Sequence, residues 1–380
     1  MDNGGIKVMH IITGLNTGGA EMMLYRLLSR TDHSRFSNIV VSLTGRGNLA
    51  DAIERLQVPV VTLELGSGSG VFRGLKNLIR QLRRYHPHII QTWLYHADLA
   101  GLIAQRFSAR SRLCWNLRCA ELGRGDVSNG TLVLRRLLSL FSGVPDVVMV
   151  NSDSGQRAHQ ALGYHPRRWE ILYNGFDTET CRRDPAARAD VRKELGVSED
   201  AQLVGLVARF DPLKDHASFI RAAGLLVDGR PQVRFVLAGR GVDSWNRVLM
   251  QQIQNVGLNG LCYLLGERDD VSKIMAALDL AVSASYSEGF PNTIGEAMAC
   301  GIPCVATDAG DSAYLVGDTG LIVPPRDPGA IARACGVLLD MPAVKRLSMG
   351  DAARQRIERL FSLGVVTERY QRIYEELGNK

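Results

Sequence analysis

The chain has 380 residues, of which 46% are hydrophobic and 22% are charged. Its length favours two domains, its composition is that of a globular protein, and no apolar run reaches the roughly 18 residues of a transmembrane helix. The net charge of +6 is placed unevenly, because residues 1–175 hold 21 Lys and Arg against 12 Asp and Glu, whereas residues 176–380 hold 24 against 27.

The basic first half predicts attraction to an acidic partner, such as anionic lipid headgroups, a phosphorylated acceptor or nucleic acid. An arginine-rich composition without functional meaning is the alternative. Nucleic acid is disfavoured, because the basic runs lack interleaved aromatic residues and zinc-finger spacings. The N-terminus does not resemble a signal peptide, and the spacings Cys114/Cys119 and Cys300/Cys304 match no standard zinc site. We therefore expect a cytoplasmic protein with reduced thiols.

In the first half, short apolar runs alternate with segments of helical periodicity. The pattern predicts strands at 6–12, 36–43, 58–65, 88–93, 112–118, 146–152 and 169–175, and helices at 20–31, 48–57 and 75–85. Strands separated by helix-length segments are typical of βαβ units, which build a parallel sheet with helices on both faces.

A second alternating series begins near residue 202. It predicts strands at 202–210, 233–241, 261–267, 280–285, 303–308 and 320–325, and helices at 217–228, 244–257 and 272–279. The polar, proline-containing segment 174–201 between the two series is interpreted as a linker. Two doubly wound α/β domains follow, and ligands of such sheets bind beyond the carboxyl ends of the strands. We expect the site in a crevice between the facing domains.

A glycine loop, with Gly14, Gly18 and Gly19, joins the first predicted strand to its helix. Its spacing is not the G-x-G-x-x-G of dinucleotide-binding proteins, which disfavours a Rossmann dehydrogenase. Such a loop still presents free N–H groups and the positive end of the helix dipole to an anion, and Glu21 is well placed for that dipole. A flexible turn is the alternative. The glycine-rich run 65–70 is interpreted as a loop only.

Four further side chains lie at or just beyond the ends of predicted strands. Arg209 ends a strand and Lys214 precedes a helix, so the two cations could grip a diphosphate. Trp93 and His96 lie at a strand-to-helix junction in the basic half, where the histidine could orient a hydroxyl. A partly buried helix-capping histidine is the alternative.

The segment 285–303 places Glu288 and Glu296 eight positions apart, with a proline between them. Pro291 argues against one continuous helix, whereas Asn292 is a candidate N-cap and Gly301 a candidate helix end. A short helix over residues 293–300 is predicted, with Glu288 in the preceding loop and Glu296 in the helix.

Gly295 lowers the helix propensity of this segment by about 1 kcal/mol relative to Ala, which we interpret as room for a ligand close to the helix. Two carboxylates at different depths suit a ligand rich in hydroxyls, such as a sugar joined to a ribose. One surface Glu and one dipole-stabilising Glu would be the purely structural alternative.

Together these motifs resemble the retaining glycosyltransferases of family 4, which have the two-domain GT-B fold. The E-x7-E signature runs from Glu288 to Glu296 and is followed by the matching segment AMACGIPCVATDAG. The motifs GGAE at 18–21, NGFD at 174–177 and AGRG at 238–241 occur in the family's order. The resemblance covers nearly the whole chain.

The resemblance implies α/β architecture with two facing Rossmann-like domains and the active site in the interdomain cleft. Residues 1–175 would bind the acceptor, residues 176–355 would bind a nucleotide sugar, and residues 356–380 would form a helix that crosses back to the first domain. The catalytic residues would be Glu288, Lys214, Arg209 and His96. The donor-binding residues would be Gly18, Gly19, Arg209, Lys214, Gly239, Glu288, Gly289, Phe290, Asn292, Thr293 and Glu296.

The resemblance also implies roles. Glu296 would bind the ribose and Glu288 the sugar hydroxyls, while Arg209 and Lys214 would neutralise the departing diphosphate in place of a metal. The expected enzyme is a retaining, metal-independent hexosyltransferase without a cofactor. It would move a sugar, from a UDP-sugar on family frequency, to a glycan or lipid-linked acceptor in polysaccharide or glycoconjugate biosynthesis. Peripheral contact with the anionic inner face of the cell membrane is expected, and nucleic acid is not.

Two alternatives stay open at this point. A sugar-nucleotide epimerase of the same fold would share much of the site, although the pairing of Arg209 and Lys214 with E-x7-E favours transfer. A non-catalytic partner that binds nucleotide sugars would lack some of the matched polar residues, all of which this chain has.

Overall fold

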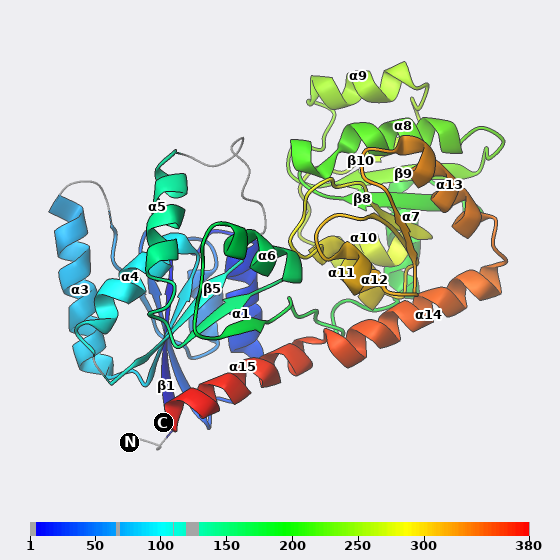
Figure 1. Ribbon diagram of the computed structural model, residues 1–380. Helices are drawn as coiled ribbons and strands as arrows, with labels where there is room; N and C mark the ends of the chain where they lie inside the picture. The colour runs from blue at the N-terminus through cyan, green and yellow to red at the C-terminus, as the bar shows by residue number, and fades with distance from the viewer. Residues whose placement is uncertain (1–4, 66–68, 109, 119–128, 380) are drawn as a thin grey trace. The chain divides into compact units, whose positions relative to one another are not determined.

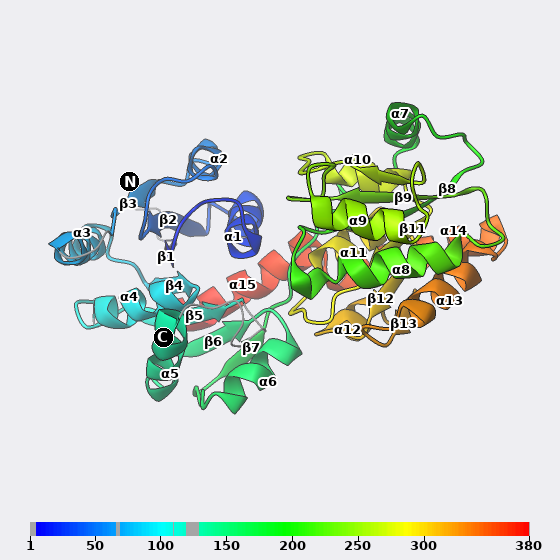
Figure 2. The same cartoon turned by 90° about the horizontal axis from the view of Figure 1, so that it is seen from above.

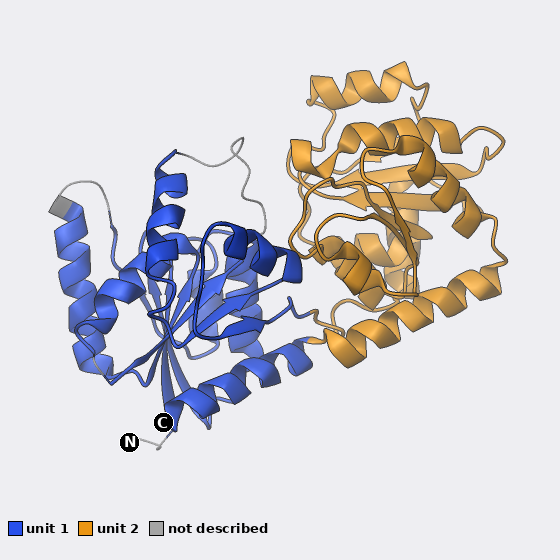
Figure 3. Cartoon of the chain, viewed as in Figure 1, with its two compact units in different colours: residues 1–175, 363–380 blue, residues 176–362 orange. Residues whose placement is uncertain are grey.

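The computed structural model describes residues 5–65, 69–108, 110–118 and 129–379 (Figure 1). It divides the chain into two compact units, coloured separately in Figure 3. Unit 1 comprises residues 1–175 and 363–380, and unit 2 comprises residues 176–362. Gly66 and Gly68 of the glycine-rich run, and Cys119, lie outside the described ranges.

Unit 1 contains a seven-stranded parallel sheet in the order β3-β2-β1-β4-β5-β6-β7. Its strands are β1 (Ile6–Ile12), β2 (Phe36–Ser42), β3 (Val60–Thr62), β4 (Ile89–Trp93), β5 (Arg112–Leu117), β6 (Val147–Val150) and β7 (Trp169–Ile171). Its helices are α1 (Gly19–Arg30), α2 (Ala50–Arg55), α3 (Ser69–Tyr85), α4 (Tyr95–Gln105), α5 (Asn129–Leu140), α6 (Asp153–Ala161) and α15 (Leu363–Gly378).

The chain starts at the centre of this sheet, moves outward to β3 and then returns to β4, which pairs with the other edge of β1. The direction of winding therefore reverses between β1 and β4, which makes their carboxyl ends the switch point of unit 1. Helices α1 and α2 pack on one face, and α3, α4 and α5 on the other (Figure 2). Because both faces are covered, the strands are almost continuously apolar, as predicted.

The last helix returns to unit 1, but later than the sequence suggested. The predicted third segment begins at residue 356, whereas α14 (Ala343–Leu360) belongs to unit 2 and α15 begins at Leu363. Two buried tyrosines hold α15 in place: Asn116 donates to Tyr370 at 2.9 Å, and Tyr374 donates to Gln91 at 3.3 Å.

Unit 2 contains a six-stranded parallel sheet in the order β10-β9-β8-β11-β12-β13. Its strands are β8 (Gln202–Val207), β9 (Val233–Ala238), β10 (Cys262–Leu264), β11 (Leu280–Ser283), β12 (Cys304–Thr307) and β13 (Leu321–Val323). Its helices are α7 (Pro185–Leu195), α8 (His216–Leu226), α9 (Arg247–Asn255), α10 (Val271–Ala277), α11 (Asn292–Ala299), α12 (Ser312–Val316), α13 (Pro328–Leu339) and α14, with a 3-10 turn at Pro212–Lys214. Its switch point lies between β8 and β11.

The predicted linker 174–201 is wrong, because it contains α7, which packs against α10 of unit 2. Asp184 caps α7 by accepting the Ala187 N–H, Pro185 is its first residue, and Gly196 ends it in the left-handed conformation. These are ordinary helix start and stop signals, which the polar composition of the segment concealed.

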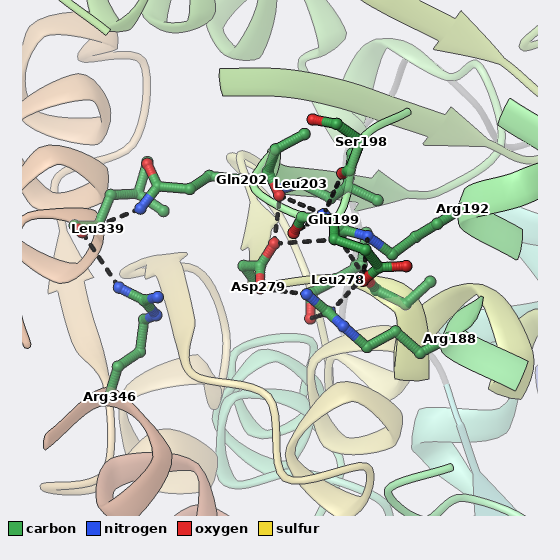
Figure 4. Close-up of polar contacts among 12 residues, drawn as sticks. Arg188, Arg192, Ser198, Glu199, Gln202, Leu203, Leu278, Asp279, Leu339 and Arg346 are labelled. Carbon is green, nitrogen blue, oxygen red and sulfur yellow. Dashed lines mark hydrogen bonds and ion pairs between the residues drawn. The ribbon is translucent and has the colours of Figure 1, made fainter. Parts of the chain in front are cut away.

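Two arginines of α7 explain why this polar helix belongs to the core (Figure 4). Arg192 is only 1% exposed and donates to the carbonyls of Ser198 and Glu199, each at 3.0 Å. Arg188 pairs with Asp279 at 2.8 Å, and Asp279 also accepts the Leu203 N–H at the start of β8. The helix is therefore bound to the central strands of unit 2 through charge pairs with Asp279, whose side chain is 15% exposed.

Within the described ranges, no helix has the length and apolar character that crossing a membrane requires.

Candidate active site

The two loops that follow β8 and β11 lie at the switch point of unit 2, where ligands of doubly wound sheets bind. They carry three of the four predicted catalytic side chains. Lys214 and Arg209 follow β8, and Glu288 follows β11. The structure thus brings together residues that are more than seventy positions apart in the sequence.

Two aspartates fix the local backbone of Lys214. Asp211 accepts the Leu213 N–H at 3.0 Å, and Pro212 supplies the first residue of the 3-10 turn. Asp215 then takes the left-handed conformation and accepts the Ser218 N–H, which starts α8. Lys214 is consequently held between two capped turns.

A short ion pair joins the two loops. Lys214 Nζ lies 2.5 Å from Glu288 Oε1, and these side chains are 23% and 12% exposed. Ser285 donates from its hydroxyl to the same carboxylate oxygen at 2.7 Å, and Leu213 accepts the Tyr286 N–H at 3.0 Å. Because backbone and side-chain bonds act together, the carboxylate and the ammonium are positioned before any ligand arrives.

Arg209 has its own carboxylate partner. Its Nε donates to Asp211 Oδ2 at 2.8 Å, and its side chain is 53% exposed. Burial works against ionisation of Asp211, but the Leu213 N–H and the Arg209 guanidinium outweigh it and lower the pKa of this carboxyl. Arg209 therefore stands at the solvent side of the loop.

The structure separates Glu288 from Glu296 as predicted, with the first in a loop and the second in α11. The predicted N-cap is wrong: Asn292 is the first residue of α11, and Pro291, which has no side-chain acceptor, occupies the cap position. Glu296 is the fifth residue of the helix and is half-buried, as is Thr293.

The end of α11 follows the prediction. Gly301 has a φ of 72°, and its N–H donates to the Met298 carbonyl while the Ile302 N–H donates to the Ala297 carbonyl. This pair of bonds is the Schellman arrangement, which needs a left-handed residue after the helix.

The structure explains the glycine at position 295 differently from the sequence analysis. A Cβ at this position would lie 2.0 Å from the ring of Phe176, so the glycine makes room for a core side chain and not for a ligand. Phe290 stacks on Phe176 at a ring separation of 6.1 Å and also contacts Phe361. Because Phe290 is 5% exposed, its ring belongs to the core, and only its backbone is placed to meet a ligand.

The other predicted glycines of unit 2 shape these loops. Gly239 has a φ of 142°, and a Cβ there would lie 2.2 Å from the Ala208 carbonyl oxygen, so the loops after β8 and β9 approach each other closely. Gly289 accepts the Asp311 N–H at 3.0 Å, which fastens the Glu288 loop to the loop after β12.

The glycine loop of unit 1 ends at the switch point of its own sheet. Gly18 is the N-cap of α1 and Gly19 its first residue, so the helix begins one position before the predicted start at residue 20. A Cβ at Gly18 would lie 2.4 Å from a carboxylate oxygen of Glu21, so this carboxylate occupies the helix N-terminus. Burial raises the pKa of Glu21, against a bond from its own backbone N–H.

His96 follows β4 at the same switch point of unit 1 and is the second residue of α4. Its side chain is exposed, so the alternative of a partly buried capping histidine is wrong. Trp93 is fully buried instead, and its Nε1 donates to His10 at 3.3 Å. Burial lowers the pKa of His10 to about 4, although the bond to Asn38 opposes this.

Sequence reasoning missed Asp211 and Ser285, the partners of the predicted ionic side chains. Asp211 could have been found from its position before a proline, which is a turn-capping signal. Ser285 carried no such signal. Among the described residues, no group of three His, Cys, Asp or Glu side chains is arranged to hold a metal ion.

Models of two glycosyltransferase domains match the chain. Residues 17–180 match "Glycosyltransferase Family 4", and residues 201–341 match "Glycosyl transferases group 1". The N-acetyl-alpha-D-glucosaminyl L-malate synthase of Bacillus anthracis is 25% identical over 285 residues, which span 74% of this chain and 72% of that one. The D-inositol 3-phosphate glycosyltransferase of Mycobacterium tuberculosis is 32% identical over 228 residues, which span 57% of this chain and 46% of that one.

Solved structures of the same fold cover nearly the whole chain. HepE of Anabaena, crystallised in complex with UDP-glucose, has a TM-score of 0.82 at 25% identity and covers 98% of this chain and 100% of its own. The sucrose-phosphate synthase of Thermosynechococcus elongatus has a TM-score of 0.79 at 19% identity and covers 98% and 99%. With two parallel α/β units and matches to both glycosyltransferase domains, the chain belongs to the family-4 type of glycosyltransferases with the GT-B fold.

Proposed function

We propose that this glycosyltransferase moves a sugar from a UDP-sugar to a glycan or lipid-linked acceptor with retention of anomeric configuration. The observation that carries the proposal is the pairing of Lys214 with Glu288 at the switch point of unit 2. A cation and a carboxylate side by side match a ligand whose diphosphate adjoins a hydroxyl-rich sugar. UDP is favoured because HepE was crystallised with UDP and UDP-glucose.

In the proposed complex, Lys214 and Arg209 bind the diphosphate from the loop that follows β8. Glu288 then accepts hydrogen bonds from the sugar hydroxyls, and Glu296 accepts them from the ribose. The amides around Gly289 to Thr293 and at Gly18 and Gly19 would add N–H donors, and His96 would orient a donor hydroxyl. Cations placed where the leaving group gains charge stabilise the transition state directly.

The proposed step is a front-face displacement. The bond between the anomeric carbon and the diphosphate oxygen breaks, and the acceptor oxygen bonds to that carbon from the same side. The acceptor's proton passes to the departing phosphate oxygen. Lys214 and Arg209 balance the resulting negative charge, so we propose that neither a metal nor a cofactor takes part.

The acceptor is proposed to bind unit 1, whose basic balance also suits peripheral contact with an anionic membrane and surface polysaccharide or glycoconjugate synthesis. A cytoplasmic enzyme at the inner face of the membrane would meet both substrates.

The test is turnover of UDP-, GDP- and ADP-sugars with product analysis, with and without a chelator. We expect UDP-sugar to be consumed, the chelator to be without effect, and Lys214→Ala and Glu296→Ala each to reduce turnover by orders of magnitude. Lys345→Ala, at an exposed position of α14, is the matched control. Conversion of the donor to its epimer, a strict divalent-metal requirement, or full turnover by both variants would each overturn the proposal.

A further inference from the structure

The exposed large apolar side chains of unit 1 gather on one face. All nine that the described residues of this unit contain belong to α3, α4, α5 or the turns after α4 and α5: Val71, Phe72, Ile103, Phe107, Val133, Leu137, Leu140, Phe141 and Val144. We call this surface the α3–α5 face. Phe72 is 80% exposed and Leu140 is 79% exposed, so these two side chains are not core residues that are only partly exposed.

The opposite face of the same sheet is different. Among the described residues of α1, α2 and α15, no large apolar side chain is exposed. Single exposed apolar residues are normal on any protein, but a gathering on neighbouring helices indicates an interaction surface. Helix α4 packs against both α3 and α5, so the three form one continuous layer (Figure 2).

Among the described residues of the α3–α5 face, the exposed charges have a single sign. Helix α3 contains five exposed cations and no acidic residue: Arg73, Lys76, Arg80, Arg83 and Arg84. Arg106 after α4 and Arg136 on α5 are exposed as well. The only acidic residue in the described ranges 69–118 and 129–145 is Asp98, which is fully buried.

Apolar and cationic side chains alternate within one hollow of this face. Phe72, Leu75 and Ile79 of α3, together with Phe107 after α4, line an open hollow of about 500 Å³. Lys76, Arg80 and Arg83 complete its wall. The spacing of the α3 residues places them on one side of the helix. An amphipathic helix with lysine and arginine beside exposed aromatic residues has the chemistry of a helix that lies in a membrane interface.

The position of Phe72 relates this face to the substrate side of unit 1. Helix α3 follows β3, so its first turn lies at the edge of the sheet where the strands have their carboxyl ends. Gly18 and His96 lie at that same edge, after β1 and β4. A bilayer that accepted Phe72 would therefore lie on the side where unit 1 is proposed to take its acceptor.

We propose that the α3–α5 face binds the surface of an anionic bilayer, with Phe72 and Phe107 in the interface and the α3 cations on the headgroups. The inference rests on the membrane contact proposed above and names the surface that makes it. Seven exposed cations, with no exposed acid among the described residues of this face, favour anionic lipid over a second copy of this equally basic surface, which would repel it.

Co-sedimentation of the full chain with vesicles tests the proposal. The probes are phosphatidylcholine vesicles with and without phosphatidylglycerol, at low and high salt. Lys76→Gln/Arg80→Gln/Arg83→Gln should weaken binding to the anionic vesicles about a hundredfold, because each cation near the surface contributes about fivefold. Its control, Arg333→Gln/Lys345→Gln/Arg359→Gln, removes three exposed cations of unit 2 and should bind as the unaltered chain does.

A second pair of variants separates apolar insertion from charge. Phe72→Ser/Phe107→Ser should weaken anionic-vesicle binding at least tenfold, whereas Trp245→Ser, at an 89% exposed position of unit 2, should not. Equal binding to both vesicle types, insensitivity to salt, or unchanged binding by the α3 variants would overturn the proposal. The proposal would also be overturned if the unaltered chain did not bind vesicles but formed a dimer that the Phe72→Ser/Phe107→Ser substitutions dissociate.

Binding of UDP by the same variants, measured by calorimetry, distinguishes this inference from the proposed function. The α3 variants should bind UDP as the unaltered chain does. A chain that binds anionic vesicles through α3 but no UDP would contradict the donor proposal alone, and the reverse result would contradict the surface alone.

Discussion

The two sheets of this chain have the same winding but different switch points. In unit 2, the loops after β8 and β11 are bonded to each other through Lys214, Glu288 and the Tyr286 N–H. In unit 1, the loops after β1 and β4 carry the exposed His96 and a helix N-terminus already covered by Glu21. The switch point of unit 2 thus carries an ion pair that neighbouring hydrogen bonds hold in place, whereas that of unit 1 carries a histidine exposed to solvent.

This difference between the switch points fits the different roles proposed for the two units, donor binding by unit 2 and acceptor binding by unit 1. A donor diphosphate needs cations in fixed positions, because the charge that develops on it must be met without reorganisation. An acceptor needs a surface that can differ between enzymes, and loops after strands supply such variation. The basic, apolar α3–α5 face adds a third kind of surface to unit 1. The following substitutions test how far the two units differ.

The largest loss of stability is expected from removing the Asp279 carboxylate of unit 2. Asp279→Ala would remove the nearer of the two carboxylates beside the buried Arg192, at 3.5 Å against 4.0 Å for Glu199, and removing one partner of a buried pair costs about 3–5 kcal/mol of unfolding free energy. Urea unfolding measures this cost. Asp351→Ala is the control, because its ion pair with Arg183 is about half exposed and should contribute about 0–1 kcal/mol. Equal losses of unfolding free energy from both substitutions would contradict the stabilising role assigned to the Asp279 ion pairs drawn in Figure 4.

Lys214→Ala should reduce kcat about 10²–10³-fold, which corresponds to a lost donor at a developing charge. Arg209→Ala should cost less, because the Arg209 side chain is 53% exposed whereas that of Lys214 is 23% exposed. Steady-state turnover of UDP-sugar, with an unchanged thermal midpoint, gives the comparison. A larger loss from Arg209→Ala would show that the fixed pair is not the centre of the site.

Gly295→Ala should destabilise unit 2 by about 1–3 kcal/mol, because its methyl group would overlap the Phe176 ring. Gly364→Ala in α15 of unit 1 is the matched control, since nothing lies within 4 Å of a Cβ there. Thermal unfolding distinguishes the two. If Gly295→Ala kept full stability and lost only donor binding, the ligand explanation would be restored.

The last comparison concerns pH. Burial lowers the pKa of His10 and His159 in unit 1, and of His216 in unit 2, from 6.5 to about 4. The unfolded chain therefore binds more protons in this window, and each histidine removes about 1.4 kcal/mol of stability per unit as the pH falls from 6.5 to about 4.

Asp98 in unit 1 acts in the opposite direction, because burial raises its pKa well above its usual range and the folded state retains its proton. Asp98→Asn should therefore steepen the acid loss of unit 1 by about 1.4 kcal/mol per pH unit and leave unit 2 unchanged. Hydrogen exchange resolves the two units. A shallower slope in the variant would contradict the assignment.

Most of the fold could be predicted, because parallel strands buried on both faces leave long apolar runs in the sequence. The segment around α7 could not, because a helix that buries arginines against Asp279 is polar in composition. The last boundary was misplaced because α14 and α15 are nearly continuous in sequence, and only tertiary contacts, such as those of Tyr370 and Tyr374, assign α15 to unit 1.

In the site, the loop-and-helix division of the two glutamates was predictable from Pro291 and Gly301, as was the placement of Lys214 beyond a strand. The contact between Lys214 and Glu288 was not, because it depends on β8 and β11 being neighbours in the sheet. Nor was the role of Gly295, since the approach of Phe176 is a tertiary contact that leaves no local signal.

The central claim is that the nucleotide sugar is held at the switch point of unit 2 between two carboxylates. Calorimetric titration of UDP-glucose into the unaltered chain, Glu296→Ala and the control Lys345→Ala tests it most directly. The account predicts that the unaltered chain and the control bind alike, and that Glu296→Ala binds at least tenfold more weakly. Equal affinity in all three proteins would contradict it.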